Sequence, residues 1–597
     1  MSKVYKYIPS VKEAADFDGL GRIVGGVVRV GRQEDEVLEG RRRLTLAEAQ
    51  TQADRYITPL DQSMMIGGVW MNTKTNVAYT GLTQMGKTSV MKLSIVQPLK
   101  RIKEGSREKV IIFDASNEFV PFVYAHVGDD TPVFILNPAD ERCYQWDMAK
   151  DVRGAANTTD LSHTLVKDKE HDTPFFSEGA RCLIAGVMDG FYLTSVKKKR
   201  SLEWTLRDVA CATSSSERIK SVLDLQPKYL SYIKEAFLDR SNNDVFSSLT
   251  ARTKELRVVA AMWHNRPKFS LREFLESEKG GVLILGADSN NRATILELNR
   301  LILERAGKII ANKPECPEAK YWFFLDEFQL MGKSEIIKQL IKDGLKRGVR
   351  VHLACQNRDD VVETYGKEGA SIIFSECGTQ YLFRQGDGNT AEQASRAIGN
   401  RRLFRPEITQ SGGASYQKST ATQDSTSSSK AKANGFNING GVIPTVSATS
   451  SETITEGRTE GKTTTETSGF NVNESVTRRI VEEAAVSTGA LQNYDIGEFT
   501  CYSSMTQGFW NHRFDWAEIE PTVKEYSQKS EHAPFIGRDE STLFDYLEDW
   551  NKKDLKRLGL PLDIIPAKTE TLPINSDAIN DDDEGESWVQ RYNQKHG

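Results

Sequence analysis

Residues 81–90 read GLTQMGKTSV, and they contain the spacing Gly81-x-x-x-x-Gly86-Lys87-Thr88. That spacing is typical of a phosphate-binding loop, in which the glycines let backbone N–H groups approach a phosphate. The Lys87 ammonium is expected to contact the β- and γ-phosphates, Thr88 to ligate Mg²⁺, and Ser89 to adjoin the nucleotide. The apolar stretch TNVAYT before the loop predicts a buried strand, and the residues after it have helical spacing. The alternative is a glycine-rich turn that precedes a helix.

A second acidic motif lies far downstream, in the stretch AKYWFFLDEFQLMGK. Its apolar run ends in Asp326 and Glu327, as expected for a strand buried on both faces of a parallel sheet. The carboxyl ends of such strands border the phosphate crevice. Asp326 is therefore predicted to hold Mg²⁺ through water, and Glu327 to polarise the attacking water as a general base. The alternative is a strand that ends in two solvated acids.

Two further strand ends carry polar side chains. The stretch RGVRVHLACQN contains Gln356, whose amide either orients water near the γ-phosphate or faces solvent. The stretch VIIFDASNEF contains Asp114 and Glu118, for which a direct role and a structural role are both open. Helix and strand patterns alternate around these motifs, which predicts an α/β fold with a doubly wound parallel sheet. These residues together predict an ATPase core whose chemistry depends on positioning and electrostatics.

Composition narrows the class of protein further. The 597 residues are 38% hydrophobic and 27% charged, which is ordinary for a globular chain of two or more domains. Seven cysteines without a C-x-x-C pair argue against a disulfide framework or a zinc site and favour a reducing cytosol. Because the net charge is −5, nucleic-acid contacts must come from local basic patches. No apolar run has the length of a membrane-spanning helix, so we expect a cytoplasmic protein that is extracted without detergent.

Changes in composition divide the chain into segments. The region from Lys197 to Glu276 has helical patterns and few strand signals, which predicts an all-α insertion in the core. Ser411 to Gly469 holds 23 Ser or Thr among 59 residues and predicts a flexible or weakly β-structured insertion. The expected boundaries are 1–60 (N-terminal region), 61–196 (first part of the ATPase core), 197–276 (all-α insertion), 277–410 (second part of the core), 411–469 (Ser/Thr-rich insertion), 470–525 (end of the core) and 526–597 (C-terminal region with an acidic tail).

Two charged stretches are candidates for binding partners. Lys197, Lys198, Lys199 and Arg200 form a basic run at the start of the helical insertion. They are predicted to contact DNA phosphates with strong salt dependence and little sequence preference, the alternative being a solvated turn. The tail at 573–597 is acidic and is either a docking peptide for a basic groove or a solvated end.

Several stretches, in the same order, resemble the type IV coupling proteins of conjugation and secretion systems, the TraD/TrwB-like ATPases that are related to FtsK and HerA motors. The resemblance covers roughly residues 66–399 and the strands near 498–514. Its most specific part is the N-P-x-D-x-R-x-x-x-W run together with the DEF strand. The stretches are GLTQMGKT, IIFDASNEFV, FILNPADERCYQWDM, FFSEGARCLIAGVM, FFLDEFQLMGK, GVRVHLACQN and YLFRQGDGNTAEQASRAIG.

The resemblance implies a RecA-like core with an inserted all-α domain, assembled as a homohexamer that hydrolyses ATP with Mg²⁺. Such a ring delivers DNA or a relaxase–DNA complex to a type IV secretion system, so relaxase and secretion-system proteins are the expected partners. An arginine acting in trans is also implied, and Arg347 and Arg384 are the candidates because the usual Arg-Lys order is shifted here. The family's usual N-terminal membrane helices are lacking, so we expect peripheral attachment at the inner membrane through partners.

Two other functions remain open at this point. The first is an adaptor that recruits relaxase or effector proteins and uses nucleotide only for assembly. The second is a HerA/FtsK-like DNA translocase that acts outside conjugation. Hydrolysis stimulated by DNA distinguishes a motor from an adaptor, whereas neighbouring genes distinguish the two kinds of motor.

Overall fold

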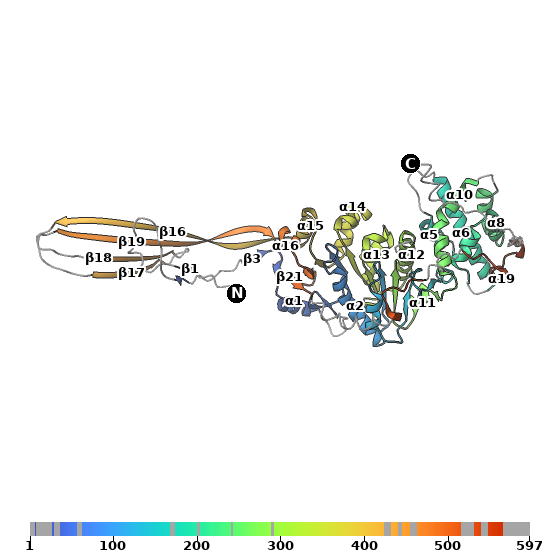
Figure 1. The fold of residues 1–597 in the computed structure, drawn as a ribbon, viewed down its shortest axis with the longest axis horizontal. Coiled ribbons are helices and arrows are strands. Elements are labelled where there is room, and N and C mark those ends of the chain that lie inside the picture. Colours follow the sequence, from blue (N-terminus) through green and yellow to red (C-terminus); the bar gives the residue numbers. More distant parts are fainter. Residues whose placement is uncertain are drawn as a thin grey trace, which may run out of the picture. The chain divides into compact units, whose positions relative to one another are not determined.

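The computed structural model separates into two compact units, residues 1–101 with 314–524 and residues 102–313 with 525–597. Figure 1 shows their elements along the chain, and each unit is described by itself below. The structure describes residues 6–7, 27–28, 36–56, 63–166, 174–199, 203–239, 243–287, 292–422, 431–439, 445–453, 462–514, 530–538 and 547–564.

The first unit is built on a mixed sheet with the strand order β4-β21-β20-β15-β7-β14-β13. Strand β7 lies between β14 and β15 and is parallel to both, and β13 is parallel to β14. Strands β20 and β21 add an antiparallel edge beyond β15. The strands are β4 (Arg42–Arg43), β7 (Val77–Thr80), β13 (Tyr321–Leu325), β14 (Val349–Cys355), β15 (Thr379–Leu382), β20 (Glu498–Ser503) and β21 (Gly508–Arg513).

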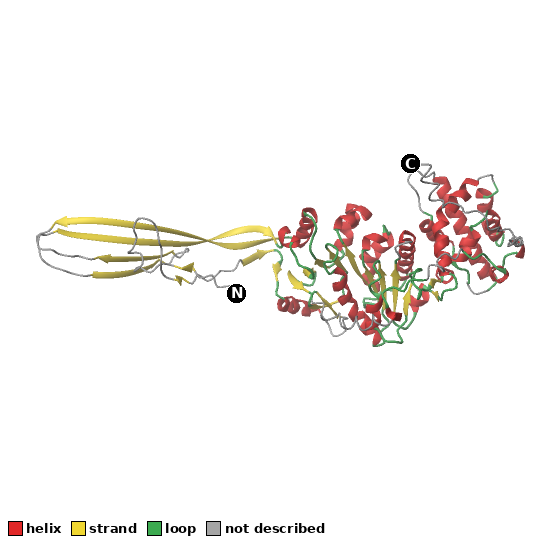
Figure 2. Ribbon diagram, viewed as in Figure 1, coloured by secondary structure: helices red, strands yellow, loops and turns green. Residues whose placement is uncertain are grey.

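The central strands β7, β13, β14 and β15 are buried along their whole length, and helices pack against their sheet (Figure 2). Continuous apolar runs suit such strands because both faces are covered. The α/β fold with a largely parallel sheet is thus confirmed. The remaining elements are α1 (Leu46–Ala53), η1 (Asp54–Tyr56), the hairpin β5 (Ser63–Ile66) and β6 (Val69–Asn72), α2 (Lys87–Lys103), η2 (Phe328–Met331), α13 (Glu335–Asp343), η3 (Gly344–Arg347), α14 (Arg358–Ser375), α15 (Gly388–Ile398) and α16 (Thr488–Gln492).

The first unit also carries a long antiparallel ribbon, which we call the arm (Figure 1); its described residues are 400–422, 431–439, 445–453 and 462–484. Strand β16 (Asn400–Thr422) pairs with β19 (Lys462–Ala484) without a register shift along the whole of both strands. Of the two alternatives for the Ser/Thr-rich segment, the described residues adopt the β-structured one. The sheet order is β17-β18-β19-β16-β3, with β3 (Glu36–Glu39), β17 (Ala431–Asn439) and β18 (Thr445–Thr453); β1 (Lys6–Tyr7) and β2 (Val27–Val28) form a separate pair.

The second unit combines parallel strands in the order β8-β12-β9 with a group of helices. Helices α5 and α6 begin at Ala155 and Pro174, upstream of the expected all-α insertion at 197–276, whose boundaries stay a prediction. The elements are β8 (Lys109–Asp114), α3 (Val120–His126), β9 (Val133–Ile135), β10 (Gln145–Trp146), α4 (Met148–Asp151), α5 (Ala155–Leu165), α6 (Pro174–Lys197), α7 (Leu206–Ala212), α8 (Ser216–Leu223), α9 (Pro227–Phe237), α10 (Asn243–Trp263), β11 (Lys268–Phe269), α11 (Leu271–Glu276), β12 (Gly281–Gly286), α12 (Arg292–Ala311), η5 (Ser530–His532), α19 (Lys552–Leu558) and η6 (Leu562–Ile564).

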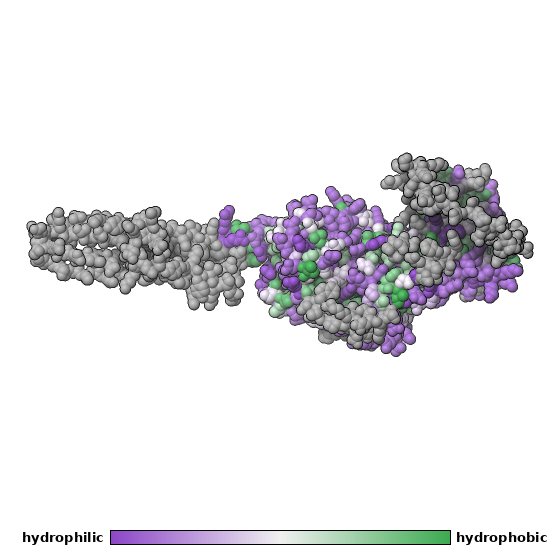
Figure 3. All heavy atoms as spheres, viewed as in Figure 1, coloured by the Kyte–Doolittle hydropathy of each residue, from purple (hydrophilic) through white to green (hydrophobic). Residues whose placement is uncertain are grey.

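The surface drawn in Figure 3 is mainly hydrophilic where it is coloured, and its apolar groups are scattered. Among the helices of the described residues, none has the length and apolar character needed to cross a bilayer.

Candidate nucleotide site

The phosphate loop connects β7 to α2, as the sequence predicts. Gly81 has a φ of +148°, and a Cβ there would lie 2.6 Å from the Phe383 Cβ and 2.9 Å from the Arg384 carbonyl oxygen. Gly86 has a φ of +96°, which is also a conformation that L side chains rarely adopt. Both glycines are therefore required by backbone shape, and helix α2 begins directly after them at Lys87.

Lys87 is buried inside the loop. Its Nζ donates hydrogen bonds to the carbonyl oxygens of Gly81 at 2.8 Å and Leu82 at 2.7 Å. Burial lowers the pKa of this ammonium, and the neighbouring Cys355, Asp326 and Glu327 oppose that effect. The ammonium is thus held at the centre of the loop by acceptors that phosphate oxygens would replace or supplement.

Thr88 and Asp326 meet across the site. The Thr88 hydroxyl donates to the Asp326 carboxylate, with Oγ1 at 3.2 Å from Oδ1 and 3.4 Å from Oδ2. Asp326 follows β13 directly and is buried. The described residues contain no group of three or more His, Cys, Asp or Glu side chains that could hold a metal alone. A hydroxyl beside one carboxylate instead suits Mg²⁺, which usually takes the rest of its ligands from water and phosphates.

Glu327 has the left-handed backbone conformation, with φ +51° and ψ +52°. A non-glycine residue in this region costs about 1–3 kcal/mol, and such residues cluster at functional sites. Its Oε1 accepts a hydrogen bond from the Gln356 Nε2 at 3.3 Å, so the ends of β13 and β14 are joined by these two side chains. Both residues that sequence reasoning placed near the γ-phosphate are therefore brought together.

Backbone groups from two other segments hold the phosphate loop. The Leu82 N–H donates to the Arg384 carbonyl at 2.9 Å, and the Gly497 N–H donates to the Met85 carbonyl at 3.1 Å. The Gln385 Nε2 also donates to the Thr80 carbonyl at 3.3 Å. Sequence reasoning missed Gly497 because a main-chain N–H group has no residue signature, and it also missed the side chain of Gln385. The glycine ahead of a predicted strand was the available signal for Gly497.

The two candidate arginines lie at different places in the first unit. Arg384 is exposed and follows β15, next to the phosphate loop that its carbonyl contacts. Arg347 ends η3, at the amino end of β14, whereas Gln356 follows the carboxyl end of that strand. A strand of this length spans about 20 Å. Arg347 is thus remote from the phosphate loop of its own chain, and its role in trans stays a prediction.

Other predicted residues lie in the second unit. The Asp114 carboxylate accepts hydrogen bonds at 2.9 Å from the backbone N–H groups of Glu118 and Phe119, so it closes its own loop. Lys197, Lys198 and Lys199 are exposed at the end of α6. Arg200 lies outside the described residues, as does the acidic tail at 573–597.

The N-P-x-D-x-R run has a structural role in the second unit. Arg142 pairs with Asp140 at 2.6 Å and donates to the carbonyl oxygens of Glu531 and Ala533, both at 2.9 Å. Trp146, which ends the run, donates through Nε1 to the Asp151 carboxylate at 2.6 Å. The most specific motif of the sequence therefore fastens residues 531–538 to this unit.

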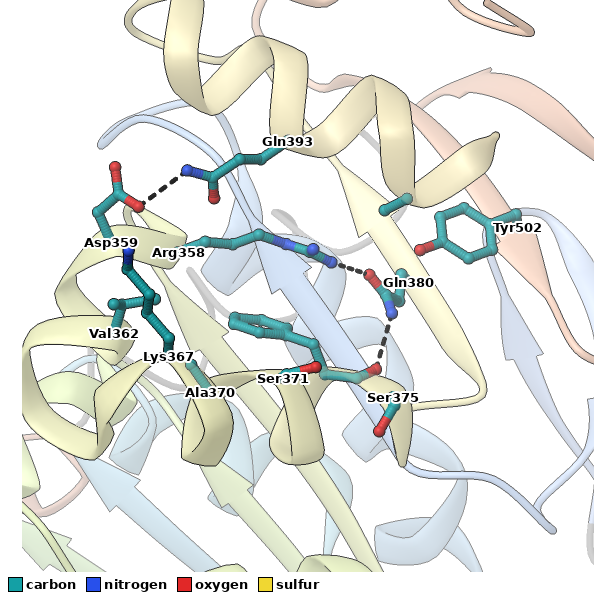
Figure 4. Close-up of a pocket in the computed structure, with 12 residues that line it drawn as sticks. Arg358, Asp359, Val362, Lys367, Ala370, Ser371, Ser375, Gln380, Gln393 and Tyr502 are labelled. Carbon is teal, nitrogen blue, oxygen red and sulfur yellow. Dashed lines mark hydrogen bonds between the residues drawn. The ribbon is translucent and has the colours of Figure 1, made fainter. Parts of the chain in front are cut away.

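A cavity of ≈ 490 Å³ lies beside the start of α14 (Figure 4). This helix begins at Arg358, two residues after Gln356. The Arg358 guanidinium crosses the cavity, donates to the Gln380 Oε1 at 2.5 Å and stacks on the Phe374 ring. Its polar groups largely satisfy one another, so the cavity adds no reactive group to the nucleotide site.

The loop, the Thr88–Asp326 pair and the Gln356–Glu327 pair lie in an α/β fold with a RecA-like phosphate-loop core. A sequence model described as the type IV secretion-system coupling protein DNA-binding domain matches residues 63–438. The chain therefore belongs to the type IV coupling protein family.

Individual relatives are more distant. Coupling protein TraD of Escherichia coli K12 is 23% identical over 320 residues, which cover 53% of this chain and 43% of TraD. A conjugal transfer protein TraG of Escherichia coli is 26% identical over 190 residues, 29% of this chain and 30% of TraG. This chain thus spans less than half the length of the curated relatives that it matches.

Solved structures of the coupling protein TrwB share the fold. A TrwB complex with ADP and Mg²⁺ has a TM-score of 0.57 at 15% identity, covering 85% of this chain and 99% of that one. An unbound TrwB lacking its N-terminal part gives 0.57 at 15% identity, with 81% and 96% coverage.

Proposed function

We propose that this protein is an ATP-hydrolysing coupling protein that drives DNA, or a relaxase–DNA complex, toward a type IV secretion system. The observation that carries the proposal is the convergence of the Thr88–Asp326 and Gln356–Glu327 pairs on one phosphate loop. The family and the nucleotide complexes of TrwB support ATP with Mg²⁺ as the ligands.

The chain's own residues have distinct roles in this proposal. Lys87 neutralises the β- and γ-phosphates, and the backbone N–H groups of the loop orient them. Thr88 and Asp326 would hold Mg²⁺, which would neutralise negative charge on the phosphates. Glu327 accepts the proton of the attacking water as general base, and Gln356 orients both that water and the Glu327 carboxylate.

We also propose that the active form is a homohexameric ring. An arginine supplied by a neighbouring subunit would stabilise charge on the phosphates, an effect worth about 10³–10⁵ in rate where it occurs. The exposed Arg384 and the remote Arg347 are both retained as candidates. Docking to membrane-bound secretion proteins would place the ring at the inner membrane.

The test is an ATPase assay with and without DNA on the full chain and on Glu327→Gln. Removing a general base lowers turnover by roughly 10²–10⁴-fold. Binding of a fluorescent ATP analogue should remain, because Lys87, Thr88 and Asp326 are unchanged. Near-normal turnover by Glu327→Gln would contradict the assignment of the base.

DNA distinguishes the motor from the adaptor alternative. A motor should hydrolyse ATP faster when DNA is added, whereas an adaptor that uses nucleotide for assembly should not respond. Glu335→Gln is the matched control, since this exposed acid lies at the start of α13, outside the nucleotide site, and should leave both activities unchanged.

A further inference from the structure

Helix α19, near the C-terminal end of the described chain, presents a basic face. At about 100° per residue, Lys552, Lys553 and Lys556 share one side of this short helix, and all three are exposed. The opposite side carries Leu555 and Leu558, which are buried. No other residue of α19 is exposed, so its outward face consists of lysines.

Arg557 and Asp554 of α19 are turned inward and contact α7. Arg557 donates to both carboxylate oxygens of the fully buried Asp208 at 2.9 Å. Asp554 pairs with Arg207 at 3.2 Å. Trp550, just ahead of the helix, donates through Nε1 to Asp208 at 3.1 Å. The helix is therefore fixed on α7, and its acid is neutralised on the side away from the lysines.

The predicted basic run at the end of α6 lies against this helix. The Lys198 Nζ lies beside Gly559, which follows α19 directly. Exposed lysines from two distant parts of the sequence are thus gathered on the second unit. They are Lys197, Lys198 and Lys199 of the α6 end and Lys552, Lys553 and Lys556 of α19, and we call them the two-segment lysine surface.

We propose that the two-segment lysine surface binds the phosphate backbone of DNA without sequence preference, and this inference rests on the proposed function. Six ammonium groups can displace condensed counterions from a polyanion. A membrane-surface helix exposes large apolar side chains opposite its lysines, whereas those of α19 are buried in the protein. Helix α19 lies outside residues 63–438, so the surface extends DNA contact beyond the DNA-binding domain that the family defines.

The experiment measures fluorescence anisotropy of a labelled duplex and a labelled single strand over a salt series. One variant of the full chain carries Lys552→Gln, Lys553→Gln and Lys556→Gln, and a second carries Lys197→Gln, Lys198→Gln and Lys199→Gln. Each should bind DNA roughly tenfold more weakly, and its slope of log affinity against log salt should fall by about 2–3. The combined variant should lose more than either.

The matched control changes three lysines of α8 and α9 in the same unit, Lys220, Lys228 and Lys234, to Gln. Two of them are paired, Lys220 with Asp239 and Lys234 with Asp224, so little change in DNA affinity is expected.

The outcomes distinguish the inference from the proposed function. If the unmodified chain binds DNA and the α19 variant has the same affinity and the same salt slope, the inference is overturned. An unmodified chain that binds neither probe would instead reject the proposed function. Loss of sedimentation with phosphatidylserine vesicles, with DNA binding unchanged, would assign the surface to membranes and also overturn the inference.

Discussion

The phosphate loop and the arm belong to the same unit but are built in opposite ways. The loop is held by contacts from segments far apart in sequence, including Arg384, Gly497 and Asp326, and it depends on unusual backbone conformations. The arm is a regular ladder from Asn400↔Ala484 to Thr422↔Lys462, and its own backbone hydrogen bonds supply the pairing. Single residues should therefore decide the geometry of the loop, whereas most positions of the arm should tolerate change.

The two ends of the arm come together beside α15. The Ala485 N–H donates to the Gly399 carbonyl at 3.0 Å, and the Ser395 hydroxyl donates to the Val486 carbonyl at 2.6 Å. Buried residues around these bonds form one cluster: Leu382, Ala391, Ala394, Ile398, Ala485, Val486, Leu491, Tyr494, Tyr502 and Phe509. From there the chain continues to Gly497, which contacts the phosphate loop. We call this meeting place the root of the arm.

The largest expected effect lies in the loop. Lys87→Ala should weaken binding of ATP by roughly a hundredfold or more, because a charge-assisted contact with the phosphates is lost. Titration of a fluorescent ATP analogue measures this loss. Lys92→Ala, further along α2, is the control and should bind normally. If Lys87→Ala and Lys92→Ala bound the ATP analogue equally well, the lysine of the phosphate loop would be no more important for binding than a lysine further along α2.

The next effect concerns His352, which lies buried in β14. Its Nδ1 shares a hydrogen bond of 3.0 Å with the Tyr79 hydroxyl. Burial, reinforced by Arg350, lowers the pKa of His352 to about 3. The His352 imidazole is protonated below about pH 6.5 in the unfolded chain, whereas in the folded chain it stays neutral down to about pH 3. The free energy of unfolding should therefore decrease as the pH falls from about 6.5 toward 3, by at most about 5 kcal/mol.

Urea unfolding of the wild type and of His352→Phe at several pH values tests this expectation. The variant has no imidazole to protonate, so its stability should fall less over that range, whatever its absolute stability. Parallel pH profiles for the two proteins would show that His352 does not govern acid lability.

The sequence predicted the loop better than the arm, for physical reasons. Lys87, Thr88 and Asp326 need particular side chains, so their spacing carries information, and the structure brings all three together. The Gly497 contact uses only an N–H group, which almost any residue has, so no motif records it. The arm's Ser and Thr content fits either a flexible segment or strands, because Thr suits a strand while the composition offers little apolar surface to bury. Pairing over many residues is a non-local property that composition does not specify.

A smaller effect is expected at the connection between the two regions. Gly497 has a φ of +80°, so Gly497→Ala should strain the backbone by about 1–2 kcal/mol and displace the donor to Met85. We expect ATP affinity to fall several-fold without loss of the fold. Gly489→Ala is the control, because nothing lies within 4 Å of a Cβ there. Unchanged ATP binding by both variants would show that Gly497 does not position the loop.

Shortening the arm removes more residues than any other change proposed above, but it should have the smallest effect on ATP affinity and turnover. Gln410 pairs with Glu474, so an Asn-Gly turn between these two residues should close a short hairpin in the same register. The root cluster and the bonds at Ala485 and Ser395 stay intact in this variant, and β16 keeps its pairing with β3 at Arg402–Phe404. Affinity for ATP and turnover without DNA should then match the wild type, because none of the groups that hold the phosphate loop has moved. A change of more than about twofold in either quantity would mean that the outer arm acts on the loop through the root, and the two regions would have to be treated as one mechanical element.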